Sequence, residues 1–339
     1  MLEKPDITDQ AILACVRTAY GLPVAQINFL PLGADQNTAV YRIVADDKTP
    51  YFLKLRGGIF DETSVTLPKL LADQDITQLI APLPTQTEEL WANLERFKVI
   101  LYPFIVGRNG YERSLSERHW RDLGAALKRI HAATIPAALI SRIRQETYAS
   151  DGRETVKSWL DRVERDVFDD PAASKCAAFL RSKRGEILDL VGRAERLAEM
   201  LQTQPPDFVV CHSDLHAGNV LIDDANDDLY IVDWDDPILA PKERDLMYAG
   251  GGLMGNGRSP QEEEMLFYEG YGPTPINPTA LAYYRYERIV QDIAAFSDQL
   301  LLTNEGCEDR ERSLGYLMSN FLPGRTIEIA YQSDKAGLS

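Results

Sequence analysis

The chain has 339 residues, 45% of them hydrophobic, and a formal net charge of −16. This length and apolar content are sufficient for two domains, each with its own core, while the acidic balance argues against nucleic acid as the main partner. No run of about 18 apolar residues occurs, so we expect no membrane-spanning helix. The negative charge either favours a cationic small molecule through long-range steering or serves solubility alone.

The N-terminal segment and the cysteines predict a reducing compartment. Residues 1–6 lack a basic region followed by an apolar one, so we expect no signal peptide. The four cysteines are widely spaced and form no CxxC pair, which is typical of free thiols (Cys15, Cys176, Cys211 and Cys307). We therefore expect a cytoplasmic protein that associates with neither membranes nor nucleic acid, and we expect it to be a monomer.

The first hundred residues predict a small sheet carrying one helix, preceded by an opening helix. Thr8 as N-cap and Gly21 as C-terminal stop place the opening helix at 8–20. Apolar or alternating runs predict strands at 27–32, 39–44, 51–55, 90–93 and 97–102. The polar segment 33–38 predicts a hairpin turn, and a second helix is expected at 61–73, where Pro68 would kink or start it.

After Pro103 the pattern becomes mainly helical. Ser114 and Glu117 have the spacing of a capping box, and apolar residues recur at helical spacing beyond them. Helices are expected at 116–131, 154–168, 174–202 and 279–302, with short strands on either side of residues 212–219. The chain is therefore predicted to be an α+β, bilobal protein, with a small N-terminal lobe at 1–103, a connector near 102–106 and a larger, mainly helical lobe at 104–339.

One segment, His212-Ser213-Asp214-Leu215-His216-Ala217-Gly218-Asn219, combines an acid, two imidazoles and an amide. An apolar run follows at 220–222, and a second strand pattern ends in acids at 231–235. Enzymes with a protein-kinase-like fold need one carboxylate at the attacking hydroxyl, an amide five residues later on magnesium, and a second carboxylate about a dozen residues further on. The pattern favours a small-molecule phosphotransferase with this bilobal fold, which uses ATP and Mg²⁺.

Asp214, Asn219 and Asp233 are the candidates for these three roles. Asp214 would orient the attacking hydroxyl and accept its proton late, because the transition state of phosphoryl transfer is loose. Asn219 and Asp233 offer oxygen ligands, which hard Mg²⁺ prefers. A lone aspartate in a loop is usually a turn former or a helix cap, but the spacing of Asp214 to the other two residues favours catalysis.

The two histidines of the segment leave a second interpretation open. In the kinase interpretation His212 is a structural brace, and His216 helps to neutralise the transferred phosphate. The pattern His-x-Asp-x-His could instead be a transition-metal site. Such a site would need a distant further ligand, because the only other histidines of the sequence, His119 and His131, lie on the helix predicted at 116–131.

Lys54 is the candidate for binding the phosphates of ATP. It lies among apolar residues in a strand pattern, where an unpaired ammonium group would be costly to bury. In kinases such a lysine contacts the phosphates and pairs with a glutamate on a helix. Glu62 is the expected partner, with Asp61 as the alternative. The other interpretation of Lys54 is an edge-strand lysine that prevents aggregation.

Weaker patterns complete the predicted nucleotide site. Backbone N–H groups of the turn at 33–38, which contains Gly33 and Asp35, would cover the phosphates, although a single glycine fits an ordinary hairpin equally well. An extended segment formed by Pro103, Phe104 and Ile105 would offer backbone groups to adenine.

Two acids directly follow the predicted metal ligand. Asp235 and Asp236 could bind an ammonium group of the substrate, or they could equally be N-caps or exposed turn residues. The aromatic and acidic residues at 267–271 and 283–287 fall on predicted helices. Most of them would pack in the core, and some could line a pocket for a polar ring.

The catalytic segment has the form H-x-D-x-H-x-x-N, and with it the chain resembles the aminoglycoside phosphotransferase family over most of its length. Further blocks carry the resemblance: Gly33-Ala34-Asp35, Tyr102-Pro103-Phe104-Ile105, Asn109-Gly110, Leu239-Ala240-Pro241-Lys242-Glu243-Arg244-Asp245-Leu246-Met247, Phe267-Tyr268-Glu269-Gly270-Tyr271-Gly272, Tyr283-Tyr284-Arg285 and Glu287-Arg288-Ile289-Val290. One residue departs from the pattern, because many members have glycine where this chain has Ser213. Either residue fits a tight loop.

The resemblance implies a bilobal protein-kinase-like fold and ATP- and Mg²⁺-dependent O-phosphorylation of an aminocyclitol or aminoglycoside antibiotic. Spectinomycin is the expected acceptor, and antibiotic resistance the expected result. The resemblance also implies that Asp214 is the base and that Asn219 and Asp233 bind the metal. Lys54 would bind phosphate, and Asp245 would be a structural acid of the larger lobe.

Two alternatives to this function remain. One is a kinase of a metabolite alcohol, such as choline, a sugar or an amino alcohol, on the same fold, because the catalytic residues do not determine the acceptor. The other is a nucleotide-binding pseudokinase with a regulatory role. The complete set of Lys54, Asp214, Asn219 and Asp233 argues against a pseudokinase.

Overall fold

Contacts within the structure, a computed structural model that describes residues 4–32, 37–255, 257–302 and 307–336, divide the chain into two units. The first unit comprises residues 1–144 and 217–237, and the second comprises residues 145–216 and 238–339. The chain thus passes from the second unit to the first between His216 and Ala217, inside the predicted catalytic segment. The predicted lobe boundary after residue 103 coincides with no end of these units, and it stays a prediction.

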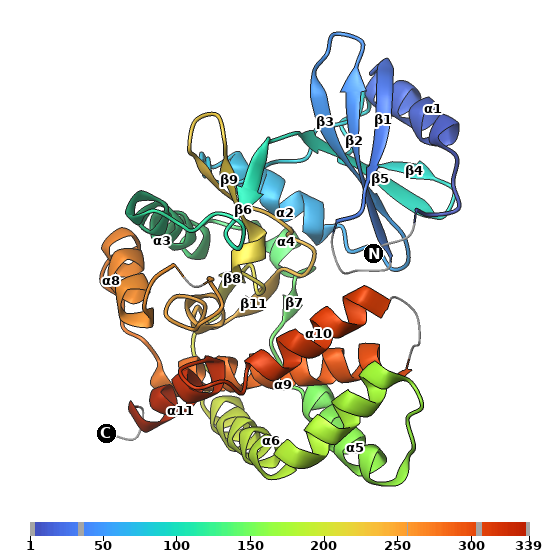
Figure 1. Ribbon diagram of the computed structural model, residues 1–339. Coiled ribbons are helices and arrows are strands. Elements are labelled where there is room, and N and C mark those ends of the chain that lie inside the picture. The colour runs from blue at the N-terminus through green and yellow to red at the C-terminus, as the bar shows by residue number, and fades with distance from the viewer. Residues whose placement is uncertain (1–3, 33–36, 256, 303–306, 337–339) are drawn as a thin grey trace. The chain divides into compact units, whose positions relative to one another are not determined.

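A five-stranded antiparallel sheet forms part of the first unit (Figure 1). Its strands, in spatial order, are β1 (Val24–Leu30), β2 (Thr38–Ala45), β3 (Pro50–Arg56), β5 (Phe97–Pro103) and β4 (Ala92–Leu94). All five are predicted from the sequence, although β1 lies slightly earlier and β4 slightly later than expected. Because β3 lies between β2 and β5, Lys54 stands in an interior strand, opposite Val40 and Ile100. The alternative of an edge-strand lysine is therefore wrong.

Two helices precede and follow the first three strands. α1 (Asp9–Tyr20) begins and ends as predicted, because the Thr8 side chain accepts a backbone hydrogen bond and Gly21 has a left-handed φ of +65°. Its buried residues Ile12 and Val16 share one core with buried residues of the sheet. α2 (Thr63–Ala72) is confirmed as well, with Pro68 inside the helix rather than at its start.

A second sheet of the first unit contains three short strands. β9 (Val220–Asp223) lies between β10 (Leu229–Ile231) and β6 (Gly107–Asn109). β6 is not among the strands predicted from the sequence. A Cβ atom at Gly107 would lie 2.4 Å from the carbonyl oxygen of Ile222, so only glycine permits the pairing of β6 with β9. A short strand that begins with glycine has too little side-chain pattern to be predicted.

α3 (Glu117–His131) packs on β10, and its N-terminal cap differs from the prediction. The hydroxyl of Ser116 accepts a hydrogen bond from His119 N at 3.2 Å, and His119 Nδ1 accepts one from Ser116 N at 3.1 Å. The predicted capping box of Ser114 and Glu117 is therefore wrong, since an imidazole nitrogen rather than a carboxylate provides the second acceptor. The short helix α4 (Ala137–Ile140) also belongs to this unit.

The second unit is mainly helical (Figure 1). The long helix α9 (Pro278–Leu302) packs against α5 (Asp151–Arg165), α6 (Pro171–Thr203), α7 (Glu243–Leu246), α10 (Cys307–Ser319) and α11 (Thr326–Ala336). The unit also contains α8 (Pro260–Tyr271) and two antiparallel strands, β8 (Val209–Cys211) and β11 (Ile238–Ala240). The short strand β7 (Arg144–Gln145) spans the point in the chain at which the first unit ends and the second begins. α5, α6 and α9 confirm the helices predicted from the sequence. α10 and α11 are not predicted from the sequence.

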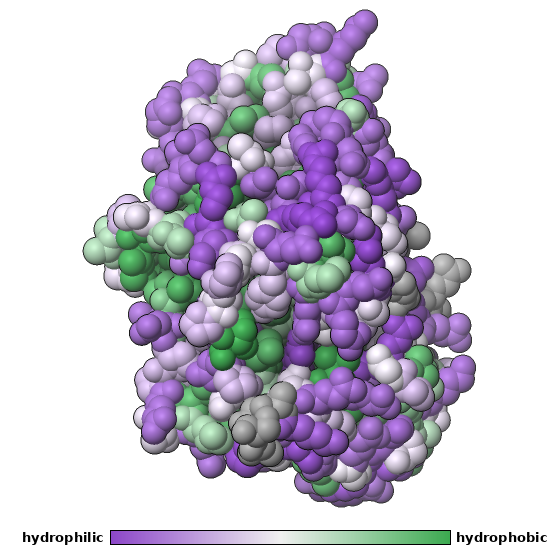
Figure 2. All heavy atoms as spheres, turned by 90° about the vertical axis from the view of Figure 1, so that its left-hand side faces the viewer, coloured by the Kyte–Doolittle hydropathy of each residue, from purple (hydrophilic) through white to green (hydrophobic). Residues whose placement is uncertain are grey.

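The hydrophilic surface and the free thiols agree with what the composition predicts. Hydrophilic residues cover most of the face drawn in Figure 2, and hydrophobic residues form separate, smaller areas. No described helix has both the length and the apolar character needed to cross a membrane. Cys15, Cys176 and Cys211 are free thiols, as expected, and burial raises the pKa of Cys176 to about 12.

Candidate active site

Lys54 of β3, in the first unit, forms ion pairs with two carboxylates of the segment that follows β10. Its Nζ lies 3.1 Å from Asp233 Oδ1 and 2.5 Å from Asp235 Oδ1. Only 11% of the lysine side chain is exposed. Burial would lower the pKa of Lys54, but the two carboxylates outweigh this effect and hold that pKa above its usual value. The ammonium group is therefore charged at neutral pH, as phosphate binding requires.

Asp235 is shared between Lys54 and Arg56, a residue that is not predicted as part of the site. Arg56 Nη1 lies 2.9 Å from Asp235 Oδ2 and 2.6 Å from Thr38 Oγ1. Strand alternation places Arg56 on the same face of β3 as Lys54, so the sequence does contain a signal for it. In the structure Asp235 therefore pairs with Lys54 and Arg56. Its predicted role at an ammonium group of the substrate stays a prediction. Asp236 is largely exposed, 3.9 Å from Arg144.

Glu62 and Asp61, the expected partners of Lys54, face other residues. The carboxylate of Glu62 forms an ion pair with Arg142, and nearly half of each side chain is exposed. Asp61 Oδ1 accepts a hydrogen bond from Thr63 N at 2.9 Å, at the start of α2. Within the described residues the expected Lys54–Glu62 pair is not formed, because the carboxylates that neutralise the ammonium group come from the segment after β10.

Asn219 and Asp233, the predicted magnesium ligands, flank the hairpin of β9 and β10. Asn219 ends the short 3₁₀ helix η1 (Ala217–Asn219), and its carbonyl oxygen accepts a hydrogen bond from Val232 N at 3.0 Å. This bond joins the two segments that carry the predicted ligands. Asp233 has a left-handed φ of +64°, which aspartate tolerates better than most residues. An amide oxygen and a carboxylate form the kind of donor set that Mg²⁺ prefers.

Gly110 supports the backbone beside Asn219. Its N–H donates to Ala217 O at 2.8 Å and to Val220 O at 3.0 Å. A Cβ atom at Gly110 would lie 2.9 Å from Leu115 Cδ1 and 3.0 Å from Ala217 O, so a larger residue would displace η1. The Asn109-Gly110 block, part of the family resemblance, thus contributes to the geometry around Asn219.

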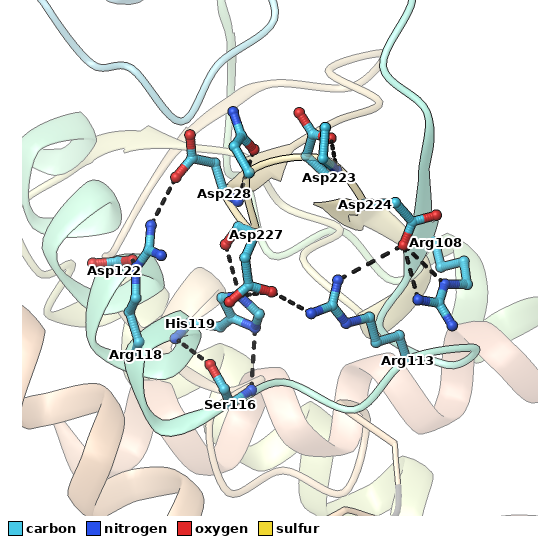
Figure 3. Close-up of polar contacts among 12 residues, drawn as sticks. Arg108, Arg113, Ser116, Arg118, His119, Asp122, Asp223, Asp224, Asp227 and Asp228 are labelled. Carbon is cyan, nitrogen blue, oxygen red and sulfur yellow. Dashed lines mark hydrogen bonds and ion pairs between the residues drawn. The ribbon is translucent and has the colours of Figure 1, made fainter.

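The turn between β9 and β10 is held by a group of ion pairs (Figure 3). Three aspartates of the turn each pair with an arginine: Asp224 with Arg108 at 2.8 Å, Asp227 with Arg113, and Asp228 with Arg118 at 2.7 Å. His119 is buried, and since its Nδ1 accepts a hydrogen bond, its Nε2 can donate to the Asp227 carbonyl oxygen at 3.0 Å. Exposed pairs contribute less than about 1 kcal/mol each. Each of these carboxylates already pairs with an arginine of the chain. We therefore interpret the acidic turn as a structural brace for the hairpin.

The segment predicted to contact adenine leaves β5 at Pro103. Phe104 and Ile105 then continue without regular structure and are partly exposed. The Arg42 guanidinium lies 5.3 Å from the centre of the Phe104 ring, within the range of a cation–π contact. The role of this segment at adenine stays a prediction, and the predicted phosphate-covering residues Gly33 and Asp35 lie outside the described residues.

Asp214, in the second unit, is surrounded by hydrogen-bond donors. Its Oδ1 lies 2.5 Å from Arg288 Nη1 and 3.4 Å from the hydroxyl of Tyr248. Its Oδ2 lies 3.5 Å from His216 Nε2. Burial would raise the pKa of the Asp214 carboxyl, but His216 and Arg288 outweigh burial and hold that pKa well below its usual range. Asp214 is therefore ionised at neutral pH and can accept a hydrogen bond from a hydroxyl group.

Asp245 of α7 holds the backbone next to Asp214. The two oxygens of this buried carboxylate accept hydrogen bonds from His212 N at 2.9 Å and from Ser213 N at 2.8 Å. His212 Nδ1 accepts a further hydrogen bond from Asp214 N at 3.3 Å. Ser213 has a φ of +75°, a conformation that glycine adopts most easily. The contacts of His212 and Asp245 thus match the bracing roles expected for them.

Arg288 and Tyr248 are not predicted from the sequence as site residues. Arg288 does lie in a block that carries the family resemblance, which is the only signal for it. Nothing local in the sequence separates Tyr248 from the core residues around it. The contact between Asp214 and Arg288 joins residues 74 positions apart, and it depends on how α9 packs.

Comparison with known proteins defines the class. Residues 28–280 match the model of the phosphotransferase enzyme family. Since this region is more than half of the chain, the chain belongs to that family, and it is an enzyme, a kinase-type phosphotransferase with a hydroxyl acceptor. The family resemblance stated from the sequence is thereby confirmed. A search of curated protein sequences gave no match.

Among solved structures, the chain is similar to spectinomycin phosphotransferase. The complex of that enzyme with ADP and spectinomycin is 37% identical, with a TM-score of 0.89, and the match covers 98% of this chain and 100% of that chain. Its AMP-bound complex is 36% identical, with a TM-score of 0.85 and coverage of 96% and 98%. A microcompartment-associated aminopropanol kinase, 16% identical with a TM-score of 0.66 and coverage of 98% and 99%, shows the shared fold alone. The predicted α+β, kinase-like fold is confirmed.

Proposed function

We propose that this phosphotransferase transfers the γ-phosphate of ATP to a hydroxyl group of spectinomycin in the cytoplasm, and that it thereby confers resistance to this antibiotic. The proposal is carried by the 37% identity, over 98% of this chain, to an enzyme whose structure contains ADP and spectinomycin together. The net charge of −16 supports a cationic acceptor, because long-range attraction favours its approach.

Lys54 would bind the phosphates of ATP. Its ion pair with Asp235 holds the ammonium group in place, and Arg56 supplies a second cation on the same face of β3. Asn219 and Asp233 would hold Mg²⁺, for which their amide and carboxylate oxygens are a fitting donor set. When bound, the ion supplies neutralisation of the charge on the phosphate oxygens.

Asp214 would orient the acceptor hydroxyl and take its proton. In a loose transition state the hydroxyl needs little deprotonation before the new bond forms. A carboxylate whose pKa is held low therefore suits this role, since orientation matters more than basicity. As the bond between phosphorus and the leaving oxygen of ADP breaks, the hydroxyl oxygen bonds to phosphorus and its proton passes to Asp214. His216, 3.5 Å from Asp214 Oδ2, would add a donor for the transferred phosphate.

The proposal is tested by measuring ADP release from the purified protein with ATP and Mg²⁺ against separate acceptors. Spectinomycin, a second aminoglycoside, choline and aminopropanol would be compared. Asp214→Asn removes the charge of the candidate base, and Asp227→Asn, in the braced turn, is the matched control. We expect ADP release that depends on spectinomycin, that is lost in Asp214→Asn and that is kept in Asp227→Asn. Expression of both variants in a spectinomycin-sensitive bacterium tests resistance in the same way.

Other outcomes of this assay favour the other candidate functions. Turnover with choline or aminopropanol, and none with spectinomycin, would refute the proposal and indicate a kinase of a metabolite alcohol. ATP binding without turnover on any acceptor would indicate a nucleotide-binding pseudokinase. The charged Lys54 and the ionised Asp214 argue against that last outcome, since both groups are in the state that catalysis needs.

A further inference from the structure

Arg288 of α9 connects Asp214 with a second, largely buried carboxylate. Its Nη1 donates to Asp214 Oδ1 at 2.5 Å and to the hydroxyl of Tyr248 at 3.0 Å. Its Nε donates to Asp292 Oδ1 at 2.9 Å, one helical turn further along α9. The guanidinium group is planar and its N–H groups point in fixed directions. Contacts on two different edges therefore fix the orientation of the whole group.

Tyr248 holds the same oxygen of Asp214 from a second direction. The tyrosine ring is buried, and its hydroxyl lies 3.1 Å from Ser213 O and 3.4 Å from Asp214 Oδ1. The Arg288 guanidinium lies over this ring, 5.9 Å from its centre. Oδ1 of Asp214 thus faces the Arg288 guanidinium, which Asp292 anchors, and the Tyr248 hydroxyl, whose single hydrogen is shared between Oδ1 and the carbonyl oxygen of Ser213.

We propose that Arg288, anchored by Asp292, is a positioning residue for Asp214: it fixes Oδ1 and so sets the direction in which the carboxylate meets the acceptor hydroxyl. The proposal rests on the role of Asp214 in the proposed function. Without the guanidinium the carboxylate could rotate, and a misplacement of about 1 Å at a reacting group can lower the rate about 100-fold. Lys54 and the predicted metal ligands take no part in the contact between Arg288 and Asp214. Removing the guanidinium should therefore lower kcat and leave KM for ATP nearly unchanged.

The charges around Asp214 give the contact a second, measurable consequence. The groups that face Asp214 or act on its neighbours are His216 from the catalytic segment, Arg288 and Asp292 from α9, and Tyr248 with Arg244 and Asp245 from the α7 region. Burial raises the pKa of Asp292, and Arg288 counteracts this. If Arg288 is removed, one of the groups that counteract burial at Asp214 is lost, and the pKa of Asp214 rises. The acid limb of the pH–rate profile then moves to higher pH, because protonated Asp214 cannot accept the hydroxyl proton.

The test uses three changes at Arg288 and one matched control, and the third change, Arg288→Ala, leaves space for added guanidine. Arg288→Lys keeps the charge but loses the planar fork, and Arg288→Met loses the charge but keeps much of the length. Arg193→Met is the control, because Arg193 of α6 forms the same kind of bridge as Arg288. It pairs with one carboxylate four residues away on its own helix and with a second carboxylate that is distant in the sequence. Its partners are Asp189 at 2.8 Å and Asp334 at 2.9 Å. A loss of stability that comes from breaking such a bridge would therefore be seen in Arg193→Met too.

In Arg288→Met we expect kcat with spectinomycin to fall about 100-fold, KM for ATP to stay nearly unchanged, and the acid limb of the pH profile to move to higher pH. In Arg288→Lys, kcat should fall less and the acid limb should stay close to that of the wild type. Millimolar guanidine should restore part of the activity of Arg288→Ala and none of that of Asp214→Ala. Arg193→Met should alter none of these quantities.

A folded Arg288→Met variant with unchanged kcat and an unshifted acid limb would overturn the proposal. If the wild type does not act on spectinomycin, the proposed function fails, and the contact is tested by thermal unfolding of the protein without ligands. Asp214→Asn and Arg288→Met should then shift the melting temperature non-additively when combined, because each removes the same ion pair. Additive shifts would overturn the proposal on that readout.

Discussion

The ammonium group of Lys54 lies 2.5 Å from Asp235, two residues beyond the predicted metal ligand Asp233. The sequence predicts a different partner, a helix glutamate, as in protein kinases, but Glu62 pairs with Arg142. One short segment after β10 thus provides both the predicted metal ligand and the carboxylate that orients the phosphate-binding lysine.

Replacing Asp235 by asparagine should weaken ATP binding. The change removes a negative charge that Lys54 and Arg56 share, and loss of one partner of a buried charge pair costs about 2–5 kcal/mol. The free-energy cost of losing this partner should be smaller here, because 27% of the Asp235 side chain is exposed. We expect KM for ATP to rise about tenfold, which corresponds to about 1.4 kcal/mol, in steady-state kinetics with ATP as the varied substrate.

Glu62→Gln is the control for this experiment. Its exposed ion pair with Arg142 contributes less than about 1 kcal/mol, so KM for ATP should stay unchanged. A larger effect of Glu62→Gln than of Asp235→Asn would show that a helix glutamate holds the lysine after all.

Local patterns predict the helix between Thr8 and Gly21 and the strand that carries Lys54, because capping and alternation are properties of neighbouring residues. They also identify Asp214, because Asp214 and Asn219 belong to the same short segment of the sequence. The partners of these residues are not predicted. Asp235 is 181 positions from Lys54, and Arg288 is 74 positions from Asp214. Such pairs depend on the packing of distant elements, which a local pattern does not contain.

Ser213 should tolerate glycine and resist a β-branched residue. Its φ of +75° costs glycine nothing but strains other residues. We expect Ser213→Gly to change the free energy of unfolding by less than about 1 kcal/mol, and Ser213→Val to lower it by about 2 kcal/mol. Chemical denaturation of the three proteins measures this. Equal stability of the valine variant and the wild type would refute the strain.

Gly107→Ala should destabilise the first unit. The added Cβ would lie 2.4 Å from the carbonyl oxygen of Ile222, so β6 must move away from β9. We expect a loss of about 1–3 kcal/mol in urea denaturation. Gly185→Ala is the control, because nothing lies within 4 Å of its Cβ on α6. That change should stabilise the protein by about 0.5–1 kcal/mol, and a shift of the same sign in both variants would speak against the close approach at Gly107.

Glu263 should make the protein less stable as the pH rises. Burial raises its pKa to about 7, although the N–H of Gly250 donates to its carboxylate and counteracts this. The pKa of an unfolded glutamate is about 4.3, so the folded state binds more protons between these two values. Stability is therefore fully present below about pH 4.3 and is lost as the pH rises towards the folded pKa of about 7.

Glu263→Gln should remove this pH dependence, since glutamine keeps an acceptor for Gly250 and does not ionise. The stability difference involved is on the order of 3 kcal/mol. Melting temperatures of both proteins at about pH 5 and about pH 8 test the prediction. The wild type should lose more stability than the variant between these conditions, and parallel losses would rule out Glu263 as the source.

The most direct measurement is to identify the product formed from spectinomycin, ATP and Mg²⁺ by mass spectrometry and phosphorus NMR, with the wild type and with Asp214→Asn. We expect the wild type to yield spectinomycin with one phosphoryl group in ester linkage. We expect the variant to form it about 100- to 10,000-fold more slowly, the range typical for loss of a group that transfers a proton. Unmodified spectinomycin with the wild type, or undiminished product with Asp214→Asn, would contradict the assignment of this chain as a spectinomycin kinase that acts through Asp214.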